Sequence, residues 1–95
     1  MADAKKITPE LKQTFDEAAE QVKSLPKAPA DDVKLKLYGL FKQATVGNNT
    51  TPKPGMLDFR GKYKWDAWTE VKDKDQVDAM EEYIALVKKL QADSE

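Results

Sequence analysis

Residues 46–58 read Val-Gly-Asn-Asn-Thr-Thr-Pro-Lys-Pro-Gly-Met-Leu-Asp, and this stretch decides how the rest of the chain can be arranged. Glycine, paired asparagine, two prolines and a Pro-Gly step oppose both helix and regular strand. A loop longer than ~12 residues is unusual in a small domain and is commonly functional or disordered. Such a loop is long enough to return the chain across a helical bundle, so we expect the helices that flank it to run parallel.

Helical periodicity lies on both sides of this loop. Thr8, Pro9 and Glu10 form a typical helix start, with a hydroxyl cap, proline in the first turn and an acid near the positive end of the helix dipole. Asp75 can cap a final helix. We expect helices over about residues 9–25, 31–45, 60–71 and 76–90. The predicted fold class is an all-α four-helix bundle with up-down-down-up topology, in which the first two helices and the last two are antiparallel neighbours.

The second predicted helix carries two apolar stripes where one is expected. The first has the spacing of a core face and comprises Val33, Leu37, Leu40, Phe41 and Ala44. The second follows another face and comprises Leu35, Tyr38 and Lys42. Because the surface of a helix outside its core stripe is normally polar, the second stripe indicates contact with something other than the core.

The 95-residue chain contains 16 Lys and Arg and 17 Asp and Glu, a net charge of −1 that conceals an asymmetry. Residues 42–64 hold five cationic side chains against the acid Asp58, so this segment carries +4 and the remainder −5. A compact cationic zone suits a small polyanion better than a long nucleic acid. A ring and an ammonium one turn apart, as at Tyr38 and Lys42, fit a base stacked beside a phosphate. These residues indicate a helical domain that binds an anionic, partly apolar ligand.

Three further aromatic positions are compatible with more than one role. Trp65 and Trp68 share a helical face with Val71, which favours core packing over a ligand platform. Tyr83 lies beside Ile84 on an apolar face, where core packing and ligand contact are equally compatible with the pattern. The sequence leaves the roles of these rings open.

No histidine and no cysteine occurs in the sequence. Disulfides, thiol nucleophiles, imidazole bases and zinc sites built on these residues are therefore excluded, whereas a carboxylate metal site or a Lys or Glu catalyst is not. No apolar run approaches the ~20 residues of a membrane span, and residues 1–7 lack the apolar core of a signal peptide. We expect one cytoplasmic domain over residues 1–95, without a metal, a cofactor or catalytic residues.

Three ordered motifs resemble the acyl-CoA-binding protein family. Residues 38–47, Tyr-Gly-Leu-Phe-Lys-Gln-Ala-Thr-Val-Gly, are similar to the family's signature, and Pro-Gly-Met-Leu-Asp follows at residues 54–58. Residues 61–68, Gly-Lys-Tyr-Lys-Trp-Asp-Ala-Trp, complete the pattern, and the resemblance extends from about Phe15 to Leu90. It implies a four-helix bundle with a long connection between helices 2 and 3. It also implies a non-catalytic, monomeric carrier that binds medium- to long-chain acyl-CoA esters tightly and buffers and transports them for lipid metabolism.

The resemblance further implies roles for individual residues. Tyr38 would stack on the adenine, and Lys42 and Lys64 would contact the ribose 3′-phosphate. Residues expected nearby or along the acyl groove are Arg60, Lys62, Lys23, Phe41, Tyr83, Ala19, Leu35 and Met56. Free CoA should bind more weakly than long-chain acyl-CoA, and free fatty acid hardly at all. The implied partners are the acyl-CoA ligand and, transiently, acyl-CoA-using enzymes or membrane surfaces, without nucleic acid or stable membrane insertion.

The chain departs from the family pattern at a few positions. Phe41 replaces a common Tyr, Arg60 a common Lys, and Tyr63 a small residue. Asn48 replaces an acid, and Asp73 occupies a turn position where glycine is usual. We therefore expect strain or rearrangement in the turn before the last helix.

Two other functions are compatible with the composition. One is an acyl-CoA-dependent transferase or isomerase module, although the sequence supplies no evident base beside the ligand. The other is a helical interaction module in which Trp65 and Trp68 face a protein partner. Separate substitutions of Tyr38, Lys42 and Lys64 distinguish a carrier from both.

Overall fold

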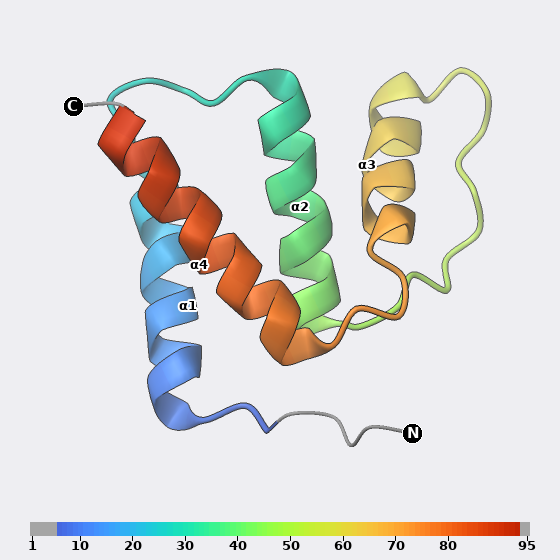
Figure 1. Cartoon of the computed structure of the whole chain (residues 1–95). Coiled ribbons are helices and arrows are strands. Elements are labelled where there is room, and N and C mark those ends of the chain that lie inside the picture. The colour runs from blue at the N-terminus through green and yellow to red at the C-terminus, as the bar shows by residue number, and fades with distance from the viewer. Residues whose placement is uncertain (1–5, 94–95) are drawn as a thin grey trace.

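The computed structural model describes residues 6–93, which form four helices and no strand (Figure 1). α1 spans Pro9–Lys23, α2 Asp31–Thr45, α3 Phe59–Glu70 and α4 Gln76–Asp93. The predicted helices are confirmed, with small differences at their ends: α1 stops before Leu25, α3 begins at Phe59, and α4 continues past Leu90. Among these described helices, none has both the length and the apolar character needed to cross a bilayer.

Side-chain caps set the starts of three helices. Thr8 Oγ1 accepts a hydrogen bond from the first turn of α1 at 3.1 Å, and Asp75 Oδ2 accepts one from the first turn of α4 at 2.9 Å, as predicted. A third cap is Asp58, whose Oδ1 accepts from Gly61 N at 3.0 Å. An N-cap is worth about 1 kcal/mol. The last residue of the long loop is therefore the start signal of α3.

The chain runs up α1, down α2, down α3 and up α4, which confirms the predicted topology (Figure 1). The packing of neighbours differs from the prediction. α4 packs against both α1 and α2, and α3 packs against α2, whereas the backbones of the consecutive pairs α1–α2 and α3–α4 do not approach closely, and α1 meets α2 through the stacked rings of Phe15 and Phe41. A short connection brings two helix ends together, but the apolar faces of the helices decide which of them pack along their length.

The core lies between α1, α2 and α4. Its buried residues are Phe15 and Ala18 from α1, Leu37, Leu40 and Ala44 from α2, and Ala79, Met80, Tyr83, Ile84 and Val87 from α4. The prediction that Phe41 belongs to the core stripe is wrong, because this residue is 37% exposed. Its ring lies at the edge of the core and stacks on Phe15 at a centroid distance of 5.5 Å.

A glycine allows α2 and α3 to approach closely. A Cβ atom on Gly39 would lie 2.5 Å from the carbonyl oxygen of Ala67 in α3, so any side chain there would force the two backbones apart. Trp68 is 6% exposed and belongs to this same interface. The approach at Gly39 therefore places the neighbouring residues of α2 directly beside α3.

The long loop, which precedes α3 in the chain, runs alongside α3 and is held to it by hydrogen bonds from two indole side chains. Trp68 Nε1 donates to the carbonyl of Gly47 at 2.7 Å, and Trp65 Nε1 donates to the carbonyl of Thr51 at 2.9 Å. Asn49 Nδ2 adds a bond to Thr69 Oγ1 at 3.1 Å. These bonds to backbone carbonyls explain how a segment without helix or strand returns the chain to the start of α3 along a defined path.

The turn between α3 and α4 is tied to the start of this loop. Asp73 has a positive φ of 69°, which confirms the strain expected there. Asn48 Nδ2 donates to Asp73 Oδ1 at 3.0 Å, and Asp73 N donates to Asn48 Oδ1 at 2.7 Å. Buried Gln43 donates through Nε2 to Asn48 Oδ1 at 2.9 Å and to the carbonyl of Lys74 at 2.8 Å. Two of the departures from the family pattern, Asn48 and Asp73, are thus direct partners.

Candidate functional site

The candidate site lies where α2 and α3 run side by side, and it pairs lysines with aromatic rings across the two helices. Lys64 of α3 has its Nζ 5.5 Å from the ring centroid of Tyr38 in α2. Lys42 of α2 has its Nζ 5.0 Å from the ring of Trp68 in α3. Each helix therefore supplies one ammonium and one ring. The predicted trio of Tyr38, Lys42 and Lys64 is brought together around these two pairs.

Three lysines outside this site, within residues 6–93, are already paired with carboxylates. Lys12 pairs with Asp16 at 2.9 Å, Lys23 with Glu20 at 3.4 Å, and Lys74 with Glu82. Lys42 and Lys64 lie over ring faces instead, and within the described residues neither forms an ion pair with a carboxylate. A cation–π contact at an exposed site is worth only about 0.5–1 kcal/mol. Their positive charge is therefore available to an anion at small energetic cost.

An open hollow of about 760 Å³ adjoins these pairs between the starts of α2 and α3. Leu35 and Tyr63 supply its apolar lining, and Arg60 and Lys64 its cationic lining toward α3. The remaining lining residues, from the first turn of α2, are Asp31, Asp32 and Lys34. The hollow thus offers an apolar surface beside cations, which suits an amphiphilic anion better than a purely ionic one.

Three aromatic side chains, one each from α1, α2 and α4, form a cluster. The centroid of Phe15 lies 5.5 Å from that of Phe41 and 5.1 Å from that of Tyr83, and Phe41 and Tyr83 are 6.0 Å apart. Tyr83 is 4% exposed, and this burial raises the pKa of its phenol above the usual value. The cluster offers solvent the partly exposed ring of Phe41, with Tyr83 buried behind it.

The other predicted site residues lie more widely apart. Lys62 is half-buried in α3, and Ala19 is half-buried against the core. Lys23 ends α1 and is paired with Glu20. Met56 is 88% exposed in the long loop. Ligand contacts at these four positions, as at the other site residues, stay predictions.

Two contacts of the site could not be found by sequence reasoning. Trp68 lies under Lys42, although its spacing indicates only a helical face. Lys53 in the long loop lies 5.9 Å from the ring of Trp65. Both contacts join residues from segments whose relative placement depends on the tertiary fold, so no local pattern indicates them.

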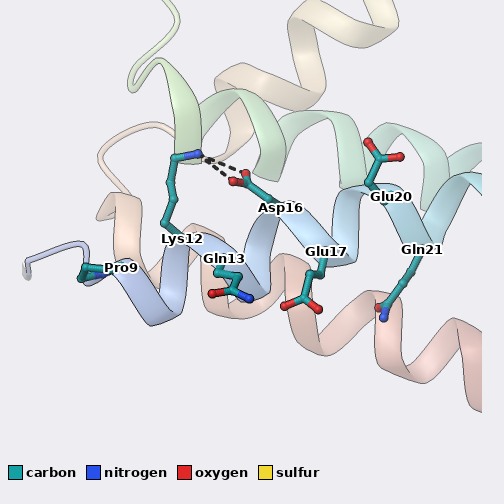
Figure 2. A pocket seen from close by; sticks show the side chains of 7 residues that line it. All are labelled: Pro9, Lys12, Gln13, Asp16, Glu17, Glu20 and Gln21. Carbon is teal, nitrogen blue, oxygen red and sulfur yellow. Dashed lines mark hydrogen bonds and ion pairs between the residues drawn. The ribbon is translucent and has the colours of Figure 1, made fainter.

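A separate hollow on the outer face of α1 contains none of the predicted site residues (Figure 2). It is lined by Pro9, Lys12, Gln13, Asp16, Glu17, Glu20 and Gln21, all from one helix. In Figure 2 the Lys12 ammonium reaches both oxygens of Asp16, at 3.1 and 2.9 Å. Because its other charges are acidic and its one lysine is already paired, this surface does not suit an anionic ligand.

The described residues also bring together no group of three or more Asp, Glu, His or Cys side chains placed to hold a metal ion. The fold and the α2–α3 face define the protein as a helical bundle with an aromatic, cationic surface on one side. Similarity to known proteins identifies the family to which this helical bundle belongs.

A family model described as "Acyl CoA binding protein" matches residues 12–87. An acyl-CoA-binding protein of Gossypium hirsutum is 56% identical over 80 residues, which are 84% of this chain and 90% of that protein. The crystal structure of Oryza sativa acyl-CoA-binding protein 2 has a TM-score of 0.84 and 47% identity, covering 87% of this chain and 92% of that one. The crystal structure of the homologous protein from Moniliophthora perniciosa has a TM-score of 0.83 and 36% identity, covering 98% and 87%. The chain belongs to the acyl-CoA-binding protein family.

Proposed function

We propose that this protein is a non-catalytic carrier that binds medium- to long-chain acyl-CoA esters with high affinity and buffers and transports them in the cytoplasm for lipid metabolism. The observation that carries this proposal is the crossed pairing of Lys64 with Tyr38 and of Lys42 with Trp68 on one face. Membership of the acyl-CoA-binding protein family supports the ligand class.

Binding of the CoA head group would replace a lysine–ring contact of the free protein with a lysine–phosphate contact. The exposed Lys64 would leave the Tyr38 ring for a phosphate, which frees that ring to stack on the adenine. A charge-assisted hydrogen bond is worth about 1.5–3 kcal/mol, more than the about 0.5–1 kcal/mol of the exposed cation–π contact that it replaces. Lys42 would contribute a second phosphate contact, with Arg60 and Lys62 close by. In the unliganded protein the rings would therefore hold the lysines near the positions that a phosphate requires.

Burial of the acyl chain would add affinity but would contribute little to recognition of the CoA head group. The partly exposed Phe41 and the half-buried Leu35 would offer it apolar contact, and Ala19, Met56, Lys23 and Tyr83 would line or border its path. Burial of each CH₂ group is worth about 0.8 kcal/mol. Long-chain acyl-CoA should accordingly bind much more tightly than free CoA, while free fatty acid lacks the groups that the lysines recognise.

The proposed carrier is a monomer with one domain over residues 1–95, without a metal or a bound cofactor. It would contact acyl-CoA-using enzymes or membrane surfaces transiently and would not bind nucleic acid. The concentration of positive charge in residues 42–64 of an otherwise acidic chain supports a small polyanion as the ligand.

Titration calorimetry with palmitoyl-CoA, CoA and palmitate tests the proposal. Tyr38→Ala, Lys42→Ala and Lys64→Ala should each weaken binding of palmitoyl-CoA, the lysine variants by about 1.5–3 kcal/mol or roughly 10- to 150-fold. Lys89→Ala, on the exposed side of α4, is the matched control and should bind like the parent protein. Equal affinity for CoA and palmitoyl-CoA would refute the carrier function. Unchanged binding in the three site variants, with their helical circular dichroism intact, would refute the site.

A further inference from the structure

Lys42, proposed above to contact a phosphate, lies in the last turn of α2. The start of the long loop and the turn between α3 and α4 both pass beside this helix end (Figure 1). Within the described residues Lys42 forms no ion pair with a carboxylate. The position of its ammonium therefore depends on neighbouring groups that are not acids.

Gly47 connects Lys42 with the ring that lies under it. The N–H of Gly47 donates to the carbonyl of Lys42 at 3.2 Å, and the carbonyl of Gly47 accepts from Trp68 Nε1 at 2.7 Å. The Trp68 ring in turn lies 5.0 Å from the Lys42 ammonium. The left-handed φ of 98° favours glycine at this position. A shift of Gly47 would disturb both the backbone of Lys42 and the ring under its ammonium.

The next residue, Asn48, is fastened to the turn between α3 and α4. Its Oδ1 accepts from Asp73 N at 2.7 Å and from Gln43 Nε2 at 2.9 Å, and its Nδ2 donates to Asp73 Oδ1 at 3.0 Å. Gln43 is 2% exposed and also donates to the carbonyl of Lys74 at 2.8 Å. Because the Asn48 side chain bridges α2 and this turn, any rotation of the segment after Gly47 would break three hydrogen bonds at once.

We propose that the pair of Asn48 and Asp73 positions the phosphate site. By fixing Gly47, the pair holds the Trp68 ring and the Lys42 ammonium where the ribose 3′-phosphate of the ligand binds. This role rests on the proposed carrier function, because the phosphate belongs to that ligand. Neither member of the pair touches the ligand, and both depart from the family pattern. A charge-assisted hydrogen bond depends on distance and angle, so a small displacement of the ammonium weakens the phosphate contact.

Titration calorimetry with palmitoyl-CoA and palmitoyl-3′-dephospho-CoA separates positioning from general stability. Asn48→Ala removes the pairing and should weaken binding of palmitoyl-CoA roughly three- to ten-fold, a part of the loss expected on removing the Lys42 ammonium itself. Binding of the dephospho ligand should change by less than about two-fold, because it lacks the group that Lys42 contacts. Thr8→Ala removes the cap of α1, a helix outside the α2–α3 face, and destabilises the fold by a similar amount. This variant is the matched control and should bind both ligands like the parent protein.

The exchange variant, Asn48→Asp combined with Asp73→Asn, is a conservative rescue. A carboxylate at position 48 can accept from the backbone N–H of residue 73, from the Gln43 amide and from the new amide at position 73, while the net charge is unchanged. Asparagine also tolerates the φ of 69° at position 73. The exchange variant should bind palmitoyl-CoA within about two-fold of the parent protein, whereas Asn48→Asp alone should be impaired, because it sets two carboxylates against each other.

The indole protons report the position of Trp68 in the absence of ligand. In heteronuclear NMR spectra of Asn48→Ala, hydrogen exchange of the Trp68 Nε1–H should accelerate about three-fold or more, because its acceptor on Gly47 is released. The Trp65 Nε1–H donates to Thr51 farther along the loop, so it is the internal reference and should change less. The exchange variant should restore the rate of the parent protein.

Three results would overturn the positioning role: equal losses for the two ligands in Asn48→Ala, an exchange variant that stays impaired, or an unchanged Trp68 indole in Asn48→Ala. Failure of the parent protein to bind palmitoyl-CoA would refute the carrier function and this role with it. A parent protein that binds palmitoyl-CoA, with Asn48→Ala binding it equally well, would refute the positioning role alone. If Asn48→Ala lacks helical circular dichroism, Asn48→Asp takes its place in both experiments.

Discussion

Asn48 and Asp73 form a reciprocal hydrogen-bonded pair, and Asn48 should tolerate replacement by an acid only where the Asp73 carboxylate is absent. Asn48 both accepts from the Asp73 backbone and donates to its carboxylate, at 2.7 and 3.0 Å. Asn48→Asp replaces that donor with a second negative oxygen facing the first. Asp73→Gly removes the carboxylate and also accommodates the φ of 69° without strain.

The size of the effect follows from the distances. Two unit charges about 3 Å apart repel by about 1.4 kcal/mol in water, and the lost hydrogen bond to a carboxylate is worth about 1.5–3 kcal/mol. Exposure of both side chains reduces this sum, and stronger bonds from the N–H donors at Asp73 and Gln43 offset part of it. We expect Asn48→Asp to lower the free energy of unfolding by about 1–2 kcal/mol. Asp73→Gly should be close to neutral, because about 1 kcal/mol of relieved strain balances one exposed hydrogen bond.

Urea unfolding of the four proteins in the double-mutant cycle, followed by far-ultraviolet circular dichroism, measures the coupling. Asn48→Asp should lower the free energy of unfolding by about 1–2 kcal/mol in the parent chain and by little in the Asp73→Gly background, and in a thermal scan this loss corresponds to a fall in Tm of about 5–15 °C. Salt at about 1 M, where the Debye length is about 3 Å, should recover part of the loss. If Asn48→Asp is equally destabilising in both backgrounds, the two residues are not energetic partners and the argument from the structure is wrong.

Two further substitutions test the helix interface and the aromatic cluster. Gly39→Ala should lower the free energy of unfolding by about 1–2 kcal/mol, because overpacking against Ala67 outweighs the gain of about 1 kcal/mol in helix propensity. Gly61→Ala, where a Cβ would displace only the Asp58 carboxylate, should be nearly neutral in the same urea experiment, and a stabilised Gly39→Ala would contradict the close approach. Burial raises the pKa of the Tyr83 phenol, so the folded protein keeps a proton that the unfolded chain releases, and stability should fall as pH rises above about 10. Tyr83→Phe should lose less stability over that alkaline range, and an identical loss in both proteins would show that this phenol is not responsible.

Local chemistry made the helices and their direction predictable. The cap at Thr8, the proline at the first position of α1 and the cap at Asp75 act over a few residues, so their effect can be inferred without the fold. The length and turn residues of the long loop allow α2 and α3 to run parallel, as predicted. The second stripe of α2 lies against α3, where Tyr38 and Lys42 contact Lys64 and Trp68, and its contact with a ligand stays a prediction.

What could not be predicted depends on packing between distant segments. Short connections indicated α1–α2 and α3–α4 as neighbours, yet the apolar faces pair α1 with α4 and α2 with both α3 and α4. Phe41 matches the core spacing of α2 but is left partly exposed at the edge of the core. The ring beneath Lys42 belongs to Trp68, and only the close approach at Gly39 brings that ring within reach.

The pairing of α1 with α4 has a consequence for how the chain folds. Every helix pair with a close backbone approach in the described structure joins segments separated by the long loop or by most of the chain, and the consecutive pair α1–α2 meets instead through the rings of Phe15 and Phe41. Contacts between distant segments require loop closure before they become stabilising, so folding should be slower than in a bundle of helical hairpins of equal length. A fragment that ends after α2 contains no closely packed helix pair of the native fold, and we expect it to stay largely unfolded until α4 is present.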